Sequence, residues 1–326
     1  MAYSKEILRR ARRQMELQKA DQASRYRQRL QEAYQQVPRL LEIDIALRST
    51  MSQAAVAAFS DGGDAEKLME QAKRENQALQ SEYDALVREH FAPGYLDTET
   101  CPHCGGSGYI GSTMCRCLMA LCLQEQRKEI AALTTGAERF SAFRLDYYPE
   151  TVDRNYGASP RLIMEKTLSA CKQYAKGFGP TGGNLLFVGG TGLGKTFLSA
   201  CIANEVTEKG YGVAYESAPQ LFTKLEKNRF NPDEEIRLQV DSFQTCDLLI
   251  IDDLGTEMPS IFVTAALYAL VNDRLLSGKS MIISTNLTME EIAVRYSPQI
   301  ASRLQGEFKR FTFVGEDIRT LKSRGR

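Results

Sequence analysis

The sequence has no excess of charge of either sign, because 41 Lys and Arg residues are balanced by 41 Asp and Glu residues. Net charge therefore predicts no polyanionic partner, and such a partner has to be inferred from local patches. Internal repeats and low-complexity tracts are absent as well, which argues against a repeat architecture. The 326 residues, 43% hydrophobic and 25% charged, are typical of a globular protein with room for two domains.

The sequence also lacks a run of about 18 apolar residues, the length needed to cross a membrane. Its N-terminus, MAYSKEILRRARRQ, has no apolar core of the kind found in signal peptides. We therefore expect a cytoplasmic protein with no membrane partner. An arginine-rich, acid-poor start also resembles an organelle transit peptide, which is the alternative. Cytosolic thiols stay reduced, so clustered cysteines there favour metal binding over disulfides.

Residues 1–95 are expected to form a helical, partner-binding region. Apolar residues such as Ile7, Leu8 and Ala11 keep a rough 3.6-residue spacing, which is typical of a helix. Pro38 can begin a second helix, DGGD at 61–64 breaks it, and a third helix runs to Pro93. Large apolar side chains are few, so the helices are expected to form a thin antiparallel bundle or coiled coil.

The first of these helices is basic. Between residues 5 and 29 it has only three acidic residues, Glu6, Glu16 and Asp21, against nine basic ones: Lys5, Arg9, Arg10, Arg12, Arg13, Lys19, Arg25, Arg27 and Arg29. One interpretation is a solvated helix face. The other is a docking surface for an acidic partner or for nucleic acid.

From residue 139 onward, short apolar runs alternate with helical stretches. NLLFV, GVAYE, DLLIID and SMIIST are continuously apolar, as are strands that a parallel sheet buries on both faces. The stretches between them have the length and pattern of helices. The sequence therefore predicts an α/β fold with a parallel sheet.

The segment GGTGLGKT fits the phosphate-binding pattern G-x-x-x-x-G-K-[ST] and stands between a predicted strand and a predicted helix. Glycines let backbone N–H groups wrap a β-phosphate, and the helix N-terminus adds a favourable dipole. Lys195 would neutralise β- and γ-phosphate oxygens, and Thr196 would offer its hydroxyl to Mg²⁺. The loop consists of Gly189, Gly190, Thr191, Gly192, Leu193, Gly194, Lys195 and Thr196.

Polar side chains follow two of the buried strands. In DLLIIDDLG, Asp252 emerges at the carboxyl end of a strand, where α/β proteins bind ligands. Asp252 would hold Mg²⁺ through water, and Asp253 would orient or deprotonate the attacking water. Asn286, after SMIIST, either holds the same water or simply turns the chain. Arg303, on a predicted helix, is either surface charge or a group that reaches the γ-phosphate of a neighbouring subunit.

Residues 139–326 resemble the AAA+ ATPase domain of DnaC/DnaI-type helicase loaders, of bacteria or phages, with transposase-helper ATPases as near relatives. The resemblance is carried in order by RFSAF, NLLFVGGTGLGKTFL, GVAYESAPQLFTKL, DLLIIDDLG, ALYALVNDRLLSGKSMIISTNL, IASRL and FVGEDIR. It implies that Gly189–Thr196 is Walker A, that Asp252 and Asp253 are Walker B, that Asn286 is sensor 1 and that Arg303 is the arginine finger. AAA+ proteins at large have Asp-Glu in Walker B. The Asp-Asp pair here suggests slow, switch-like hydrolysis.

Because the sequence continues only a short way past Arg319, we expect it to lack the helical lid of many AAA+ proteins. Arg319 is therefore a weak candidate for the sensor 2 arginine. The resemblance further implies ATP and Mg²⁺ as cofactors. It implies a hexameric, DnaB-type replicative helicase and single-stranded DNA as partners, and assembly as a homo-oligomer or on the helicase ring. Lys224, Lys227 and Arg229 are either DNA contacts or a solvated face.

Four of the eight cysteines lie in CPHCGGSGYIGSTMCRC, with the spacing C-x2-C-x10-C-x-C. Cys101, Cys104, Cys115 and Cys117 would complete a tetrahedral, structural Zn²⁺ site within a module at 96–123. His103 is an alternative ligand, and Cys122 is expected to be buried. Reactive thiols and disulfides are the other interpretations. Metal binding would stand in for a core in a region poor in apolar residues.

CPHCGGSG also resembles one zinc repeat of DnaJ-type chaperones, but that family uses several copies. DnaI-type loaders have a zinc module ahead of the ATPase, which fits better. The predicted protein is thus a helical region, a zinc module, a linker at 124–138 and an ATPase that loads a replicative helicase on single-stranded DNA. Two alternatives are a transposase-helper ATPase and an adaptor that binds ATP without hydrolysing it.

Overall fold

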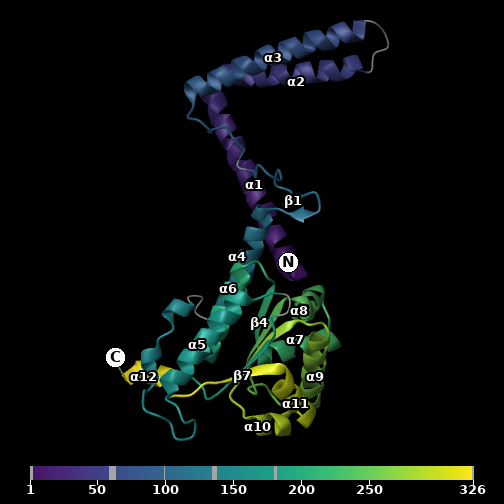
Figure 1. Ribbon diagram of the computed structural model, residues 1–326. Helices are drawn as coiled ribbons and strands as arrows, with labels where there is room; N and C mark the ends of the chain where they lie inside the picture. The colour runs from purple at the N-terminus through teal and green to yellow at the C-terminus, as the bar shows by residue number, and fades with distance from the viewer. Residues whose placement is uncertain (1–2, 59–63, 99, 134–137, 180–181, 325–326) are drawn as a thin grey trace. The chain divides into compact units, whose positions relative to one another are not determined.

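The computed structural model describes residues 3–58, 64–98, 100–133, 138–179 and 182–324. Internal contacts divide the chain into two compact units. One consists of residues 15–110, and the other of the residues before 15 together with those from 111 onward. The helices and strands of both units are labelled in Figure 1. Within the described ranges, every helix is too short or too polar to span a bilayer.

Three long helices account for most of the N-terminal third of the chain. They are α1 (Lys5–Gln36), α2 (Pro38–Ala58) and α3 (Asp64–His90). Pro38 is the first residue of α2, where its missing N–H has no helical partner to lose. The expected three helices are therefore confirmed, while most of the DGGD segment lies outside the described residues.

Helices α2 and α3 pack against each other as an antiparallel pair (Figure 1). Among the described residues of this unit, few apolar side chains are buried: Ala33, Leu40, Ile43 and Ala72. Charge pairs supplement them, because the Arg39 Nε lies 2.8 Å from Glu82 Oε1, joining α2 to α3. The antiparallel packing of α2 on α3 agrees with the predicted antiparallel arrangement of the helices.

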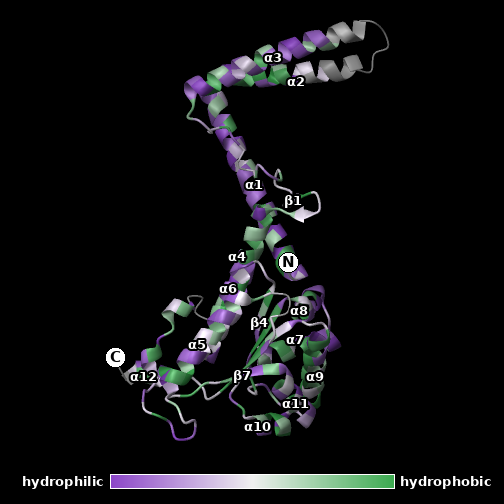
Figure 2. Cartoon of the chain, viewed as in Figure 1, coloured by the Kyte–Doolittle hydropathy of each residue, from purple (hydrophilic) through white to green (hydrophobic). Residues whose placement is uncertain are grey.

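The larger unit is built on a five-stranded, fully parallel sheet. Its strands are β3 (Asn184–Val188), β4 (Val213–Ser217), β5 (Leu248–Leu254), β6 (Ser280–Thr285) and β7 (Phe308–Thr312), in the order β4-β5-β6-β3-β7. β5 and β6 are buried almost throughout, and Figure 2 colours much of the sheet as hydrophobic and α1 as largely hydrophilic. The four predicted strands and the α/β class are confirmed.

The fifth strand, β7, was not predicted. Its sequence FKRFT contains Lys309 and Arg310, both exposed. An edge strand shows one side to solvent, so it needs no continuous apolar run and instead tolerates charge.

Helices cover both faces of the sheet. One face is packed by α5 (Pro160–Gly177) and α6 (Lys195–Glu208). The other is packed by α7 (Ala218–Phe230), α8 (Glu234–Thr245), α9 (Ile261–Leu276), α10 (Met289–Arg295) and α11 (Pro298–Glu307). The remaining elements are the short strands β1 (Tyr109–Ile110) and β2 (Thr113–Met114), the helices α4 (Arg116–Leu133) and α12 (Ile318–Arg324), and the 3-10 turns Phe140–Ala142 and Leu145–Tyr147.

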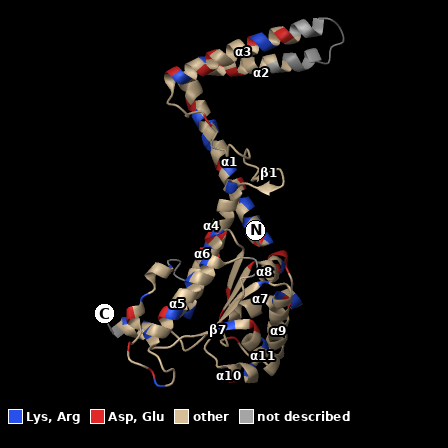
Figure 3. Ribbon diagram, in the orientation of Figure 1, with Lys and Arg blue, Asp and Glu red and all other residues tan. Residues whose placement is uncertain are grey.

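The first turns of α1 belong to the larger unit, where they form ion pairs. Arg10 hydrogen-bonds to Glu129 on α4 and also lies within 4 Å of Glu6 and Glu125. Lys5 Nζ lies 3.7 Å from Asp241 Oδ2 on α8. Basic residues recur along the rest of α1 (Figure 3). The basic helix is thus neither wholly solvated nor wholly available to a partner.

Arg274 on α9 is fully buried and joins three elements at the amino edge of the sheet. Its guanidinium donates to the carbonyls of Phe243 (2.7 Å) and Gln244 (3.3 Å) at the end of α8. It also donates to those of Cys246 (3.2 Å), before β5, and Ser280 (2.6 Å), in β6. The carbonyl end of a helix favours a cation, so these oxygens take the place of a counter-ion.

We predict that Arg274→Met destabilises the chain, because several buried carbonyls lose their donors. The expected loss is about 3 kcal/mol or more of unfolding free energy, a fall in Tm of roughly 6–12 °C. Arg237→Met, at an exposed position of α8, is the control and should leave Tm nearly unchanged. Equal melting curves for the two variants, measured by circular dichroism, would contradict this role of Arg274.

Candidate nucleotide site and cysteine cluster

The glycine-rich loop lies between β3 and α6, as predicted, and its glycines are required sterically. Gly192 has φ +72°, and a Cβ there would lie 2.0 Å from Asp317 Oδ1. Gly189 has φ +154°, and a Cβ there would lie 2.5 Å from the Phe313 carbonyl oxygen. Side chains at these positions are excluded by the segment that follows β7. Glycine at these positions therefore allows the loop backbone to lie close to that segment.

Lys195 is the first residue of α6, and its side chain is buried under the loop. Its Nζ donates to the carbonyls of Gly189 and Gly190, each at 2.7 Å. Burial lowers the pKa of Lys195, while the charges of Asp253 and Asp252 oppose that shift. A buried ammonium that is held by loop carbonyls and lies near two carboxylates is placed to meet the phosphates of a nucleotide.

Asp252 and Asp253 lie near the carboxyl end of β5 and differ in their surroundings. Asp252 is buried and accepts hydrogen bonds from Ser284 Oγ and, at 3.1 Å, from the Tyr215 hydroxyl. Asp253 has φ +55°, the only positive φ of a described residue other than glycine. The ladder between β5 and β6 is irregular here, between Ile251 and Leu254. The bulge turns the Asp253 side chain away from the core.

The pKa of Asp253 is raised, first by burial and then by the charge of Asp252, whereas Lys195 and Arg319 lower it. A raised pKa makes a carboxylate a better proton acceptor. Its N–H donates to Ser284 Oγ at 2.9 Å, and its carbonyl accepts from Thr256 Oγ1 at 2.8 Å. The backbone of this residue is therefore fixed on both sides.

A cavity of about 490 Å³ opens beside the loop, within the size range of small-molecule sites. Its polar side is formed by Thr191–Thr196 and Asp253. Its opposite side is partly aromatic and partly basic: Phe143, Arg144, Tyr147, Tyr148, Ile318, Arg319 and Lys322. The Tyr148 hydroxyl donates to the Leu193 carbonyl at 2.8 Å, which attaches this wall to the loop. A phosphate chain fits the polar side and a base the aromatic side.

The structure brings only some of the predicted residues together. Arg319, a weak candidate from sequence, lines the cavity from α12, which follows β7 after a short loop. Asn286 lies directly after β6, is exposed and is outside the cavity lining. Arg303 lies on α11 with its guanidinium 5.4 Å from the centre of the Tyr268 ring. In this single chain, neither Asn286 nor Arg303 meets the loop.

The donor set at this edge suits magnesium, which prefers hard oxygen ligands. Asp252 supplies a buried carboxylate, and Thr196, in the first turn of α6, supplies a hydroxyl beside the cavity. The Tyr215 hydroxyl lies 3.3 Å from the Thr196 carbonyl and 3.1 Å from Asp252 Oδ2, so the two residues are close together. Thr196 and Asp252 are the residues that would hold Mg²⁺.

Tyr215 and Ser284 were not singled out by sequence reasoning. Each is one residue within an apolar strand, and nothing in the spacing distinguishes it from core. Lys224, expected to be either a DNA contact or part of a solvated face, forms an ion pair with Glu216. Arg229 lies over the rings of Phe230 and Phe262.

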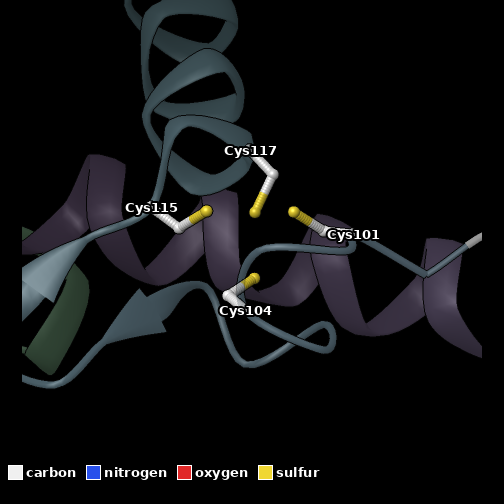
Figure 4. A group of neighbouring side chains, drawn as sticks. All are labelled: Cys101, Cys104, Cys115 and Cys117. Atoms are coloured by element: carbon white, nitrogen blue, oxygen red, sulfur yellow. The ribbon is translucent and has the colours of Figure 1, made fainter.

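The four predicted cysteines are close together in the short segment 101–117, with their sulfur atoms within 4.8 Å of one another (Figure 4). Sulfurs around a tetrahedral zinc stand about 3.8 Å apart, given a Zn–S bond of about 2.3 Å. The cluster could therefore hold zinc with small adjustments. β1 and β2 pair within this segment, where only a mobile loop was expected.

His103 and Cys122 lie near the cluster in sequence but are not part of it. His103 is exposed and outside the cysteine cluster. Cys122 is fully buried, as predicted, and burial raises the pKa of its thiol to about 11. A thiol that keeps its proton is a poor metal ligand.

Comparison with known proteins gives one family match and several relatives. The family described as IstB-like ATP binding protein matches residues 153–301. The replicative helicase loader DnaC of Escherichia coli K12 is 25% identical over 138 residues, 42% of this chain and 56% of DnaC. The loader DnaI of Bacillus subtilis is 30% identical over 112 residues, 34% of this chain and 35% of DnaI. The matches thus span about half or less of these relatives.

Among solved structures, a crystal structure of the DnaC helicase loader has a TM-score of 0.46 and 20% identity. The match covers 54% of this chain and 97% of the DnaC chain.

We predict one zinc per chain in protein purified without chelator, measured by elemental analysis. Cys104→Ser should lower that content, because a tetrahedral site needs all four thiolates. His103→Ala, in the same turn but outside the cluster, should keep it. Protein without zinc, or a loss of zinc with His103→Ala alone, would contradict the four-cysteine site.

Proposed function

We propose that this protein is an ATP-dependent loader of a replicative DNA helicase, because residues 153–301 match the IstB-like ATP binding protein family and the chain is similar to the DnaC and DnaI helicase loaders. It would place a hexameric, DnaB-type helicase on single-stranded DNA in the cytoplasm. The observation that carries the ATPase part is one cavity lined by the glycine-rich loop, by Asp253 and by Arg319.

The residues around the cavity suggest how ATP is turned over. The loop N–H groups and Lys195 bind the phosphates, and Arg319 adds positive charge from α12. Thr196 and Asp252 would hold magnesium, which would supply positive charge to the phosphates. Asp253, with its raised pKa, orients the attacking water and accepts its proton. In the single chain Arg303 is not among the residues that line this cavity, and its supply by a neighbouring subunit would make hydrolysis depend on assembly.

The helical region at 1–95 is proposed to bind the helicase. Leu41, Ile45 and Met69, on the helices α2 and α3, are 42%, 60% and 43% exposed, so this pair offers apolar side chains to a partner. The zinc module at 96–123 would hold the start of α4, and the segment 124–138 would connect it to the ATPase domain at 139–326. ATP binding would favour the loader-helicase complex, and hydrolysis would release it.

A transposase-helper ATPase is the second candidate, because the matching family is IstB-like. Such a helper shares the ATPase core but does not need a zinc module. Loading assays separate the two functions. The full chain should place the host's replicative helicase on circular single-stranded DNA with ATP, as measured by strand unwinding. Absence of both helicase binding and unwinding would overturn the loader proposal and leave the helper.

We predict that Asp253→Asn binds ATP but hydrolyses it about 100-fold more slowly, because the general base is lost. A phosphate-release assay measures turnover, and a fluorescent ATP analogue measures binding. Lys195→Ala is the companion variant and should lose binding itself. Turnover of Asp253→Asn at the wild-type rate would assign the base elsewhere. No hydrolysis by the wild type, even with helicase and DNA, would indicate an adaptor that only binds ATP.

Arg303→Ala should keep ATP binding but lose the part of hydrolysis that assembly stimulates, since a finger acts only across an interface. Arg310→Ala, exposed on β7, is the control and should behave as wild type. Mixing Arg303→Ala with Asp253→Asn tests the geometry, because a mixed interface pairs an intact finger with an intact base. If no mixing ratio restores hydrolysis, Arg303 does not act between loader subunits.

A further inference from the structure

Two residues outside the predicted site contact the Asp252 carboxylate from the neighbouring strands. Tyr215, on β4, donates to Asp252 Oδ2 at 3.1 Å. Ser284, on β6, hydrogen-bonds to Asp252 Oδ1. Since β5 lies between β4 and β6, these side chains approach the carboxylate from opposite sides. Tyr215 is 4% exposed and Ser284 is fully buried, so water cannot take their place.

A buried carboxylate is costly unless hydrogen bonds compensate it. Both partners are suited to donate. The Tyr215 hydroxyl lies 3.1 Å from Asp252 Oδ2, and a phenol can donate its proton to a carboxylate oxygen. Ser284 donates to Asp252 and uses its lone pair to accept the Asp253 N–H at 2.9 Å. One serine thus fixes the carboxylate of one aspartate and the backbone of the next.

The Tyr215 hydroxyl has a second acceptor within reach. Its oxygen lies 3.3 Å from the carbonyl of Thr196, in the first turn of α6. A phenol has one proton, so it donates to Asp252 or to Thr196 but not fully to both. A tyrosine serving only as core would be satisfied by the Thr196 carbonyl. Because the Tyr215 hydroxyl also contacts Asp252, it connects Thr196 and Asp252, the two residues that would hold magnesium.

We propose that Tyr215 and Ser284 are positioning residues of the nucleotide site, which fix the Asp252 carboxylate where the magnesium ion of the bound nucleotide is held. The inference rests on the proposed nucleotide function. It adds that this buried pair sets the magnesium dependence of nucleotide binding, separately from the contacts that the loop makes with phosphate.

The experiment measures affinity for fluorescent ADP in Mg²⁺ and in EDTA, so that hydrolysis plays no part. Tyr215→Phe keeps the ring and removes the hydroxyl. Its affinity in EDTA should match wild type, while the gain in affinity on adding Mg²⁺ should fall about tenfold, the effect of one hydrogen bond to a charged group. Tyr174→Phe is the matched control: that hydroxyl donates to the Gly183 carbonyl at 3.0 Å, and Tyr174 lies outside the cavity lining.

Ser284→Ala is the second variant and should reduce the Mg²⁺ gain in the same direction. Its control is Ser199→Ala, also fully buried, whose Oγ has no hydrogen-bond partner among the described residues. Circular dichroism confirms folding of each variant before titration. The inference is overturned if a folded variant, Tyr215→Phe or Ser284→Ala, shows the same increase in ADP affinity on adding Mg²⁺ as the wild type. A wild-type affinity in Lys195→Ala instead overturns the nucleotide site itself, which is a different result.

Discussion

The buried carboxylate of Asp252 is the constraint on which the carboxyl edge of the sheet depends. A charge at this depth requires partners, and the partners come from three elements that are distant in sequence. Tyr215 and Ser284 donate from the flanking strands, and the charge of Lys195 acts from α6. The strand order makes this arrangement available, because β6 lies between the strand of the glycine-rich loop and the strand of Asp252. The strand order therefore determines both the fold of the sheet and the surroundings of the Asp252 carboxylate.

The opposite edge of the same sheet has a buried cation instead. Arg274 donates to carbonyls at the end of α8 and at the starts of β5 and β6, where no side-chain acid is among its hydrogen-bond acceptors. Backbone carbonyls point out of a helix at its C-terminus and attract positive charge. One polar group thus organises each end of β5, while Leu248, Leu249, Ile250 and Ile251 between them are fully buried.

Sequence reasoning succeeded where a pattern has a single physical cause. SMIIST is apolar throughout because a central parallel strand is buried on both faces, and the glycine loop requires positive φ at Gly192. The strand β7 could not be predicted in this way, since an edge strand needs no continuous apolar run. Tyr215 was missed because a tyrosine in an apolar strand looks like core. Its role depends on which strand lies beside β5, and that is a property of topology. Arg303 remains a prediction, because a second chain would have to complete its surroundings, and Asn286 remains one, because it lies outside the cavity lining in this chain.

The start of the chain contributes to the same sheet. β4 is an edge strand, and an uncovered edge invites pairing with another chain. Ser4 and Ile7, at the start of the chain, lie with Gln126 and Glu129 of α4 around a small cavity lined also by Gly212 and Val213. Gln126 Nε2 lies 3.5 Å from the Tyr211 carbonyl, before β4. The first turns of α1 and the later turns of α4 thus lie beside the strand that contains Tyr215. Arg10 forms ion pairs with Glu125 and Glu129 of α4, and these pairs join the two helices beside the β4 edge.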